Sequence, residues 1–87
     1  MTHEEIRAAV LQCLAGAVPE LNEQSLQASV PFRDQLDMDS IDVLNFVVAL
    51  DERFGVAVPE SDYPKIATLD ACVAYLEAAL PGVKQES

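Results

Sequence analysis

The sequence predicts an all-α fold, a small antiparallel four-helix bundle with three main helices, one short helix and a long first loop. Apolar residues recur at helical spacing in three separate segments, and helix start and stop signals flank those segments. The one β-like run, Val56–Val58, is too short and too isolated to pair into a sheet. With 87 residues and 51% hydrophobic content, the chain is expected to form one domain, residues 1–87, with a compact core.

The first helix is predicted to begin at Thr2. The Thr2 hydroxyl can accept from the Glu5 N–H while the Glu5 side chain reaches back, which is a capping box. We expect Gly16 to end the helix in the left-handed conformation, because Pro19 prevents continuation soon after. The apolar residues at helical spacing form its buried face: Ile6, Val10, Cys13 and Leu14.

A long connection, residues 17–38, follows the first helix. It carries isolated apolar residues, which predict a connection pinned over the core rather than a disordered linker. These anchors are Leu21, Leu26, Val30, Phe32 and Leu36. The connection is too long to join two adjacent helices as a simple hairpin.

The second helix is predicted from about Ser40 to Phe54, with Asp39 as its N-cap and Gly55 closing it. Asp42 adds negative charge that favours the first turn. Apolar residues wrap further round this helix than a single buried stripe needs. We expect Val43, Val47, Leu50 and Phe54 to face the core, and Ile41, Leu44 and Val48 to form a second stripe beside Ser40.

The run Val56–Val58 is expected to be an extended loop leading to Pro59. Glu60–Lys65 is predicted to contain a helical turn interrupted by Pro64.

A last helix is predicted to start at Thr68 or Asp70 and to end at Pro81-Gly82. Its inward residues are expected to be Leu69, Cys72, Val73, Leu76 and Leu80.

The strong negative charge restricts the possible partners. Five basic residues against fifteen acidic ones give a net charge of −10, which opposes contact with nucleic acid and with anionic membrane surfaces. No segment approaches the roughly 18 apolar residues of a membrane span, and the N-terminus has no signal-peptide pattern. We therefore expect a soluble, cytoplasmic monomer that binds basic protein partners.

The cysteines do not indicate a metal site. Cys13 and Cys72 lie far apart, and the single histidine, His3, cannot complete a zinc set with them. Both cysteines fall on apolar helical stripes, so we expect small, reduced core residues, with a disulfide possible but not required.

The residues from Asp37 to Val48 also argue against a selective calcium-binding loop of the EF-hand type. Asp37 and Asp39 match the first two ligand positions of an EF-hand, but the fifth position is Ile41. The turn glycine is replaced by Asp42 and the twelfth-position glutamate by Val48.

Ser40 is the candidate functional residue. Its predicted position at a helix N-terminus suits a covalently attached phosphate, because backbone N–H groups and the positive end of the helix dipole point there. The chain has one histidine, His3, and no Gly-x-Ser-x-Gly elbow, so Ser40 lacks the base of a hydrolytic nucleophile. The sequence indicates an attachment point rather than a catalytic residue.

The residues around Ser40 resemble the acyl carrier protein family. The matching segments are Asp39-Ser40-Ile41, Val43 to Phe54 with its Glu-x-Phe-Gly ending, Val56 to Pro59, and Lys65 to Leu69. The resemblance implies a protein without catalytic activity whose Ser40, preceded by Asp39, carries 4′-phosphopantetheine added from coenzyme A by a phosphopantetheinyl transferase. The thiol of that arm would hold acyl groups as thioesters for enzymes of fatty-acid, polyketide or specialised lipid biosynthesis.

The chain departs from that family on its expected docking surface. Asp37 stands where many members have glycine, Asn45 replaces a usual glutamate, and Val48 replaces a frequent methionine. The residues expected to dock partner enzymes through their basic patches are Asp37, Ile41, Leu44, Asn45, Val48 and Glu52.

Two alternatives remain at this point. The first is a non-catalytic acidic helical adaptor, in which Ser40 is an ordinary capping-region residue and Leu44 and Val48 are core. The second is a peptidyl or aminoacyl carrier, although such carriers more often place glycine-rich sequence before the serine, where this chain has Asp39.

Overall fold

The computed structural model describes residues 2–80 and is all-helical, with no strand in that range. It confirms the predicted helical bundle. The α-helices are α1 (His3–Ala17), α2 (Phe32–Gln35), α3 (Ser40–Phe54) and α4 (Leu69–Ala79). Two 3₁₀ helices, η1 (Glu23–Ser25) and η2 (Glu60–Ile66), lie in the connections. None of the helices in the described part of the chain is long and apolar enough to cross a membrane.

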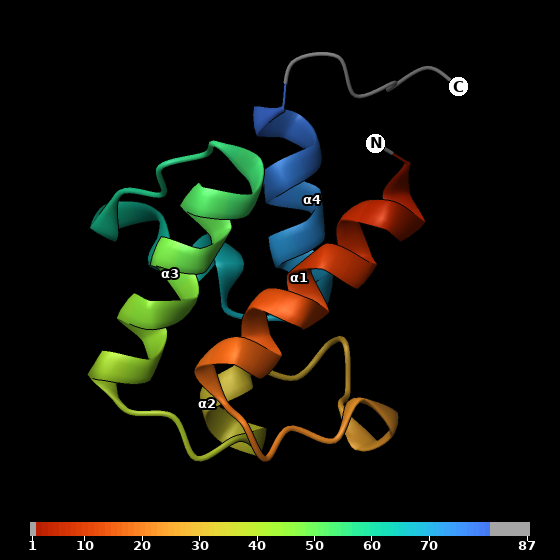
Figure 1. Cartoon of the computed structure of the whole chain (residues 1–87), viewed down its shortest axis with the longest axis vertical. Coiled ribbons are helices and arrows are strands. Elements are labelled where there is room, and N and C mark those ends of the chain that lie inside the picture. The colour runs from red at the N-terminus through yellow and green to blue at the C-terminus, as the bar shows by residue number, and fades with distance from the viewer. Residues whose placement is uncertain (1, 81–87) are drawn as a thin grey trace.

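Helix α1 is the centre of the bundle. It packs against both α3 and α4, and α4 packs against η2. Figure 1 shows that α1 runs opposite to α3 and α4, which run in the same direction because the segment containing η2 returns the chain between them. The short α2 lies near the end of α1 and the start of α3 (Figure 1).

The start of α1 is as predicted, but its end is not. Thr2 and Glu5 form both hydrogen bonds of the capping box. The predicted inward residues Ile6, Val10, Cys13 and Leu14 are all buried. Gly16, however, lies inside the helix, which continues to Ala17, and Gly16 does not have a positive φ. The helix extends one residue beyond Gly16 because Pro19, which follows the C-cap Val18, lies outside it.

The first connection is pinned as predicted and is more ordered than a plain loop. Phe32 is buried and the other anchors are half-buried. The Gln35 side chain clamps the connection: its Nε2 donates to the carbonyls of Gln27 and Val30 at 2.7 and 2.8 Å, and its Oε1 accepts from the Gln27 N–H. These bonds join α2 to the residues that follow η1, while the Asn22 side chain caps η1 by accepting from the Gln24 N–H.

Helix α3 begins at Ser40 and ends at Phe54, as predicted, and Gly55 closes it with a left-handed φ of 70°. The core-facing stripe is also confirmed, since Val47 and Leu50 are buried and Val43 and Phe54 pack against the core while half-buried.

The predicted interruption at Pro64 is wrong. The 3₁₀ helix η2 runs through Pro64 to Ile66. A proline φ fits a 3₁₀ helix, so only the hydrogen bond of the missing N–H is lost. Helix α4 starts after Thr68, whose hydroxyl accepts from the Ala71 N–H, and therefore not at Asp70.

The predicted inward face of α4 is confirmed. Leu69, Cys72, Val73 and Leu76 are buried, and Leu80 is half-buried against the core. The predicted stop at Pro81-Gly82 lies outside the described residues. Cys13 and Cys72 are buried free thiols. Burial raises the pKa of Cys72 to about 12 and raises that of Cys13 as well, so both stay protonated and unreactive at neutral pH.

The two glycines at helix ends give a matched test of these backbone assignments. A Cβ added at Gly16 or at Gly55 meets no atom within 4 Å, so only backbone conformation distinguishes the sites. Gly16→Ala should raise the free energy of unfolding by about 0.4–1 kcal/mol, because alanine is the better helix former. Gly55→Ala should lower it by about 1–2 kcal/mol, because alanine disfavours the left-handed conformation. Denaturant unfolding of both variants measures the two signs, and stabilisation by Gly55→Ala would contradict the described end of α3.

Candidate functional site

Ser40 is the first residue of α3 and is exposed. The preceding residue, Asp39, is the N-cap. Its side chain accepts from the Asp42 N–H at 2.9 Å, and the Asp42 side chain accepts from the Asp39 N–H at 3.3 Å. These two bonds form a reciprocal cap in which an aspartate takes the place of the usual glutamate. The cap leaves the Ser40 hydroxyl free of hydrogen bonds to any residue in the range 2–80.

The start of α3 is suited to an attached phosphate. The N–H groups of Ser40 and Ile41 have no intrahelical acceptor in the first turn, and the helix dipole favours negative charge there. An exposed hydroxyl at this point leaves space for a long substituent. The residues present therefore fit a phosphodiester-linked arm.

Among residues 2–80, no side chain is hydrogen-bonded to the Ser40 hydroxyl to activate it as a nucleophile. The only histidine of the chain, His3, lies on α1 and pairs with Glu77 of α4 at 2.8 Å. Among residues 2–80 there is also no cluster of three or more metal-ligating side chains. The described residues around Ser40 therefore form neither a hydrogen-bonded nucleophile–base pair nor a metal centre.

The turn before α3 accommodates Asp37 without strain. The Met38 N–H donates to the Leu36 carbonyl at 2.9 Å, which makes a three-residue turn centred on Asp37. No non-glycine residue in the described part of the chain has a positive φ. The conformation at Asp37 therefore does not require the glycine found in many carriers, and the exposed carboxylate lies close to the start of α3.

One face of α3 is apolar and exposed. Ile41, Leu44 and Val48 are 63%, 50% and 46% exposed. Asn45 and Glu52 are exposed on the same helical face by their spacing. We call this surface, made of Ile41, Leu44, Asn45, Val48 and Glu52, the outer face of α3. A core role for Leu44 and Val48, as the adaptor alternative required, is wrong.

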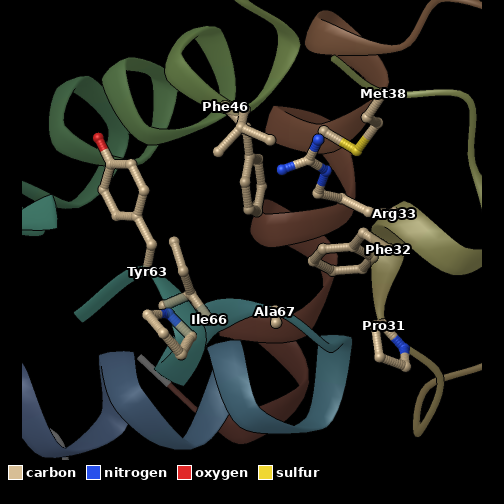
Figure 2. A pocket seen from close by; sticks show the side chains of 10 residues that line it. Pro31, Phe32, Arg33, Met38, Phe46, Tyr63, Ile66 and Ala67 are labelled. Atoms are coloured by element: carbon tan, nitrogen blue, oxygen red, sulfur yellow. The ribbon is translucent and has the colours of Figure 1, made fainter. Parts of the chain in front are cut away.

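An apolar cavity of about 260 Å³ lies behind the start of α3. Figure 2 shows side chains from α2, α3 and η2 around it. The lining residues are Pro31, Phe32, Arg33, Met38, Val43, Phe46, Tyr63, Pro64, Ile66 and Ala67. Pro31, Arg33 and Pro64 are exposed, so the cavity reaches the surface. Because a dry apolar cavity of roughly 150 Å³ is enough to bind benzene, this one can take a hydrocarbon segment.

Short-range contacts hold the cavity walls together. The rings of Phe32 and Phe46 meet edge to face with centroids 5.6 Å apart, which joins α2 to α3. The Phe32 N–H donates to the Ala67 carbonyl at 2.8 Å, which joins α2 to the segment before α4.

A second set of contacts holds η2 against α4. The Tyr75 hydroxyl donates to Asp62 at 2.7 Å, and Lys65 lies 3.4 Å from the other oxygen of the same carboxylate. The hydrogen bond from Tyr75, together with Lys65, lowers the pKa of Asp62 below its usual value, and the same bond raises the pKa of Tyr75. This arrangement positions Tyr63, which lies between Asp62 and Lys65 on the cavity wall.

Most of the cavity was not predicted from the sequence. Phe32 was predicted only as an anchor, and the roles of Arg33, Met38 and Tyr63 were not foreseen. The spacing Asp39-x-x-Asp42 does carry a capping-box signal that would have identified the second half of the cap.

The protein family follows from comparison with known sequences. The family model for the phosphopantetheine attachment site matches residues 8–76, which include the start of α3 and every residue of the cavity wall. The chain belongs to this family of phosphopantetheine-bearing carriers.

Individual relatives agree with the family match. The chain is 35% identical to an acyl carrier protein of Helicobacter hepaticus over 77 residues, which cover 88% of this chain and 95% of the relative. It is 31% identical to the acyl carrier proteins of Lactobacillus acidophilus and an Exiguobacterium strain. Those matches cover 90% and 92% of this chain, and 96% and 100% of the two relatives.

Family membership confirms three predictions. The chain resembles acyl carrier proteins, its cofactor is 4′-phosphopantetheine, and it is a carrier rather than an enzyme. These findings argue against the alternative of a helical adaptor that carries no cofactor.

The hydrogen bond between Tyr75 and Asp62 should make stability depend on pH in a defined direction. Because the pKa of Asp62 is lowered in the folded state, its contribution is present above the ordinary carboxylate pKa of about 4 and is lost as the pH falls through the folded value. Tyr75→Phe should therefore lower the melting midpoint at neutral pH, and the difference from the natural protein should shrink in acid. Tyr63→Phe is the control, since the Tyr63 hydroxyl makes no hydrogen bond within residues 2–80. A difference for Tyr75→Phe that stays constant from neutral pH to strong acid would contradict this role of Asp62.

Proposed function

We propose that Ser40 carries the 4′-phosphopantetheine arm and that the chain delivers acyl groups, held as thioesters on the arm's thiol, to partner enzymes. The observation that carries this proposal is the exposed Ser40 hydroxyl at the capped start of α3, inside the segment that matches the phosphopantetheine family. Asp39 acts here as a positioning residue, because its cap fixes where the helix starts.

The cavity is the proposed site for the apolar part of the cargo. Its walls are formed mainly by Phe32, Met38, Phe46 and Ile66, all buried. An acyl chain that leaves water for this space gains roughly 0.8 kcal/mol for each buried methylene group. Because this gain is modest for a few methylene groups, the acyl chain is shielded from water between reactions and can still leave the cavity for a partner enzyme.

The outer face of α3 is the proposed docking surface, together with Asp37. An exposed apolar patch near acidic side chains suits a partner with a basic rim around an apolar groove. The net charge of −10 raises encounter rates with such partners, while the small patch keeps complexes weak enough to separate after each step. Phosphopantetheinyl transferase and acyl-modifying enzymes with basic docking patches are the partners that this surface fits.

For the pathway, we propose only the chemical class of the group that is carried. An apolar cavity behind Ser40 favours acyl groups of fatty-acid, polyketide or specialised lipid synthesis over a peptidyl or aminoacyl cargo. We further propose that residues 1–87 act as one carrier domain and a monomer. A cytoplasmic location stays a prediction of the sequence.

The attachment residue is tested by modification in vitro. Incubation with coenzyme A and a broad-specificity phosphopantetheinyl transferase should convert the protein completely to one modified species, measured by intact-mass spectrometry. Ser40→Ala should remain unmodified, and Ser61→Ala, which removes another exposed serine, should be modified as the natural protein is. Modification of Ser40→Ala would contradict the assignment.

The docking surface is tested by comparing two leucines of α3. Leu44 is 50% exposed, so Leu44→Ala should lower the free energy of unfolding by less than about 0.5 kcal/mol. Leu50 is fully buried, and Leu50→Ala should cost about 2–5 kcal/mol. Leu44→Ala should nevertheless slow acylation by partner enzymes.

The departure at Asn45 adds a second test of the same surface. Asn45→Glu should speed acylation by enzymes of primary fatty-acid synthesis if the missing charge distinguishes this carrier. Unchanged acylation rates in both Leu44→Ala and Asn45→Glu would place the docking surface elsewhere.

A further inference from the structure

Three residues connect the attachment site to the cavity. A shallow depression on the surface is lined by Ser40, Leu44 and Glu60 together with Arg33, Val43 and Tyr63. The last three also line the apolar cavity. We call Arg33, Val43 and Tyr63 the throat, because they line both the depression beside Ser40 and the cavity. Val43 is apolar, whereas the other two residues bring a cation and a hydroxyl.

Arg33 has no ion-pair or hydrogen-bond partner among residues 2–80, although the protein is strongly acidic. The chain has fifteen acidic residues against five basic ones. The ion pairs found within residues 2–80 are His3 with Glu77 and Lys65 with Asp62, and neither involves Arg33. Arg53, by comparison, donates to Gln12 at 3.0 Å. Arg7 of α1 also has no hydrogen bond or ion pair within residues 2–80, but it lines a different depression. Glu60 lines the same depression as Arg33 and still lies beyond ion-pair distance. A guanidinium so placed is available to an anion from outside the chain.

The direction of the Arg33 side chain supports a role toward the cavity. In Figure 2 it extends from α2 toward the space between Met38 and Phe46, with the guanidinium at the cavity rather than turned away from it. The Tyr63 hydroxyl also makes no hydrogen bond within the described residues. The throat thus has two unused donor groups beside an apolar interior.

From this arrangement we propose that Arg33 selects acyl cargo bearing a carboxylate, by pairing its guanidinium with that group at the throat. The inference rests on the proposed function, since it takes the cargo to be attached at Ser40. A guanidinium binds a carboxylate through two parallel hydrogen bonds, a geometry that lysine cannot reproduce. With the free acid group held at Arg33, the part of the cargo between that group and the thioester lies along Val43 at the mouth of the cavity, where the carboxylate remains partly hydrated.

A carboxylate explains the position of Arg33 better than a plain hydrocarbon chain does. A saturated chain offers the guanidinium no acceptor beyond its thioester carbonyl. The aliphatic stem of Arg33 would in that case only cover the cavity while its charged head stays in water. The arm's own phosphodiester is the other anion near Ser40, so the experiment must separate a carboxylate of the cargo from the phosphate of the arm.

The experiment loads the intact protein with acyl-coenzyme A probes through a phosphopantetheinyl transferase. One probe is octanoyl and the other is suberoyl, the half-thioester of a dicarboxylic acid of the same length, with an isotope label in its free carboxyl carbon. Nuclear magnetic resonance titration gives the pKa of that carboxyl group. The comparison includes Arg33→Gln, Arg33→Lys and, as a control that removes the same charge elsewhere, Arg53→Gln.

The expected result is a cargo pKa lower in the natural protein than in Arg33→Gln by at least about 0.5 unit, since a nearby cation favours the ionised carboxylate. Arg33→Lys should give an intermediate value, and Arg53→Gln should match the natural protein. Equal pKa values in the natural protein and Arg33→Gln would overturn the proposal. So would a shift of the same size in Arg53→Gln, because only long-range charge would then act.

Two further measurements distinguish a failure of the role proposed for Arg33 from a failure of the proposed function. The first is the phosphorus resonance of the phosphopantetheine arm in the protein without cargo. If Arg33→Gln moves this resonance but leaves the pKa of the cargo carboxyl group unchanged, Arg33 binds the phosphate of the arm and the proposal is overturned. The octanoyl form should melt at a higher temperature than the cargo-free form in both the natural protein and Arg33→Gln. Absence of that rise would refute the cavity as the acyl site, while the carboxyl titration would still decide the role of Arg33.

Discussion

Two reciprocal hydrogen bonds between Asp39 and Asp42 fix the residue at which α3 begins, and the rest of the site depends on that starting point. With Asp39 as the cap, Ser40 is the first helical residue and its hydroxyl is exposed. A start one residue later would instead make Ser40 the N-cap, whose hydroxyl accepts from a backbone N–H of the first turn. The two faces of α3 are set by packing, since Phe46 is buried at the cavity while Leu44 and Val48 are exposed.

Helix α3 therefore has to satisfy two surfaces at once. Phe46, Val47 and Leu50 are buried, and the opposite stripe, Ile41, Leu44 and Val48, remains in water at the cost of exposing apolar area. Such exposure is unfavourable for an isolated domain, and it is the observation that supports the proposed docking surface. The acidic residues around it limit self-association and favour basic partners.

Much of the fold was predictable because local rules act on short stretches of sequence. Residues only a few positions apart in the sequence determine the cap at Thr2, the left-handed Gly55 and the two stripes of α3. Gly16 and Pro64 were predicted wrongly because their conformations depend on how far the surrounding helix extends, which sequence signals do not give. The cavity was not predictable, since Phe32, Phe46 and Ile66 are brought together only by tertiary packing and by contacts such as the Phe32 N–H to the Ala67 carbonyl. Arg33 gave no signal in the sequence for the same reason.

The central claim is that an acyl group attached through Ser40 on the surface lies in the apolar cavity behind the start of α3. The most direct test is measurement of nuclear Overhauser contacts between the chain protons of an octanoyl group loaded on the protein and the side chains of the natural sequence. The account predicts contacts to Phe46, Ile66 and Met38, which line the cavity interior. Contacts confined to Ile41 and Leu44 on the outer face of α3, or no contacts to the protein at all, would contradict it.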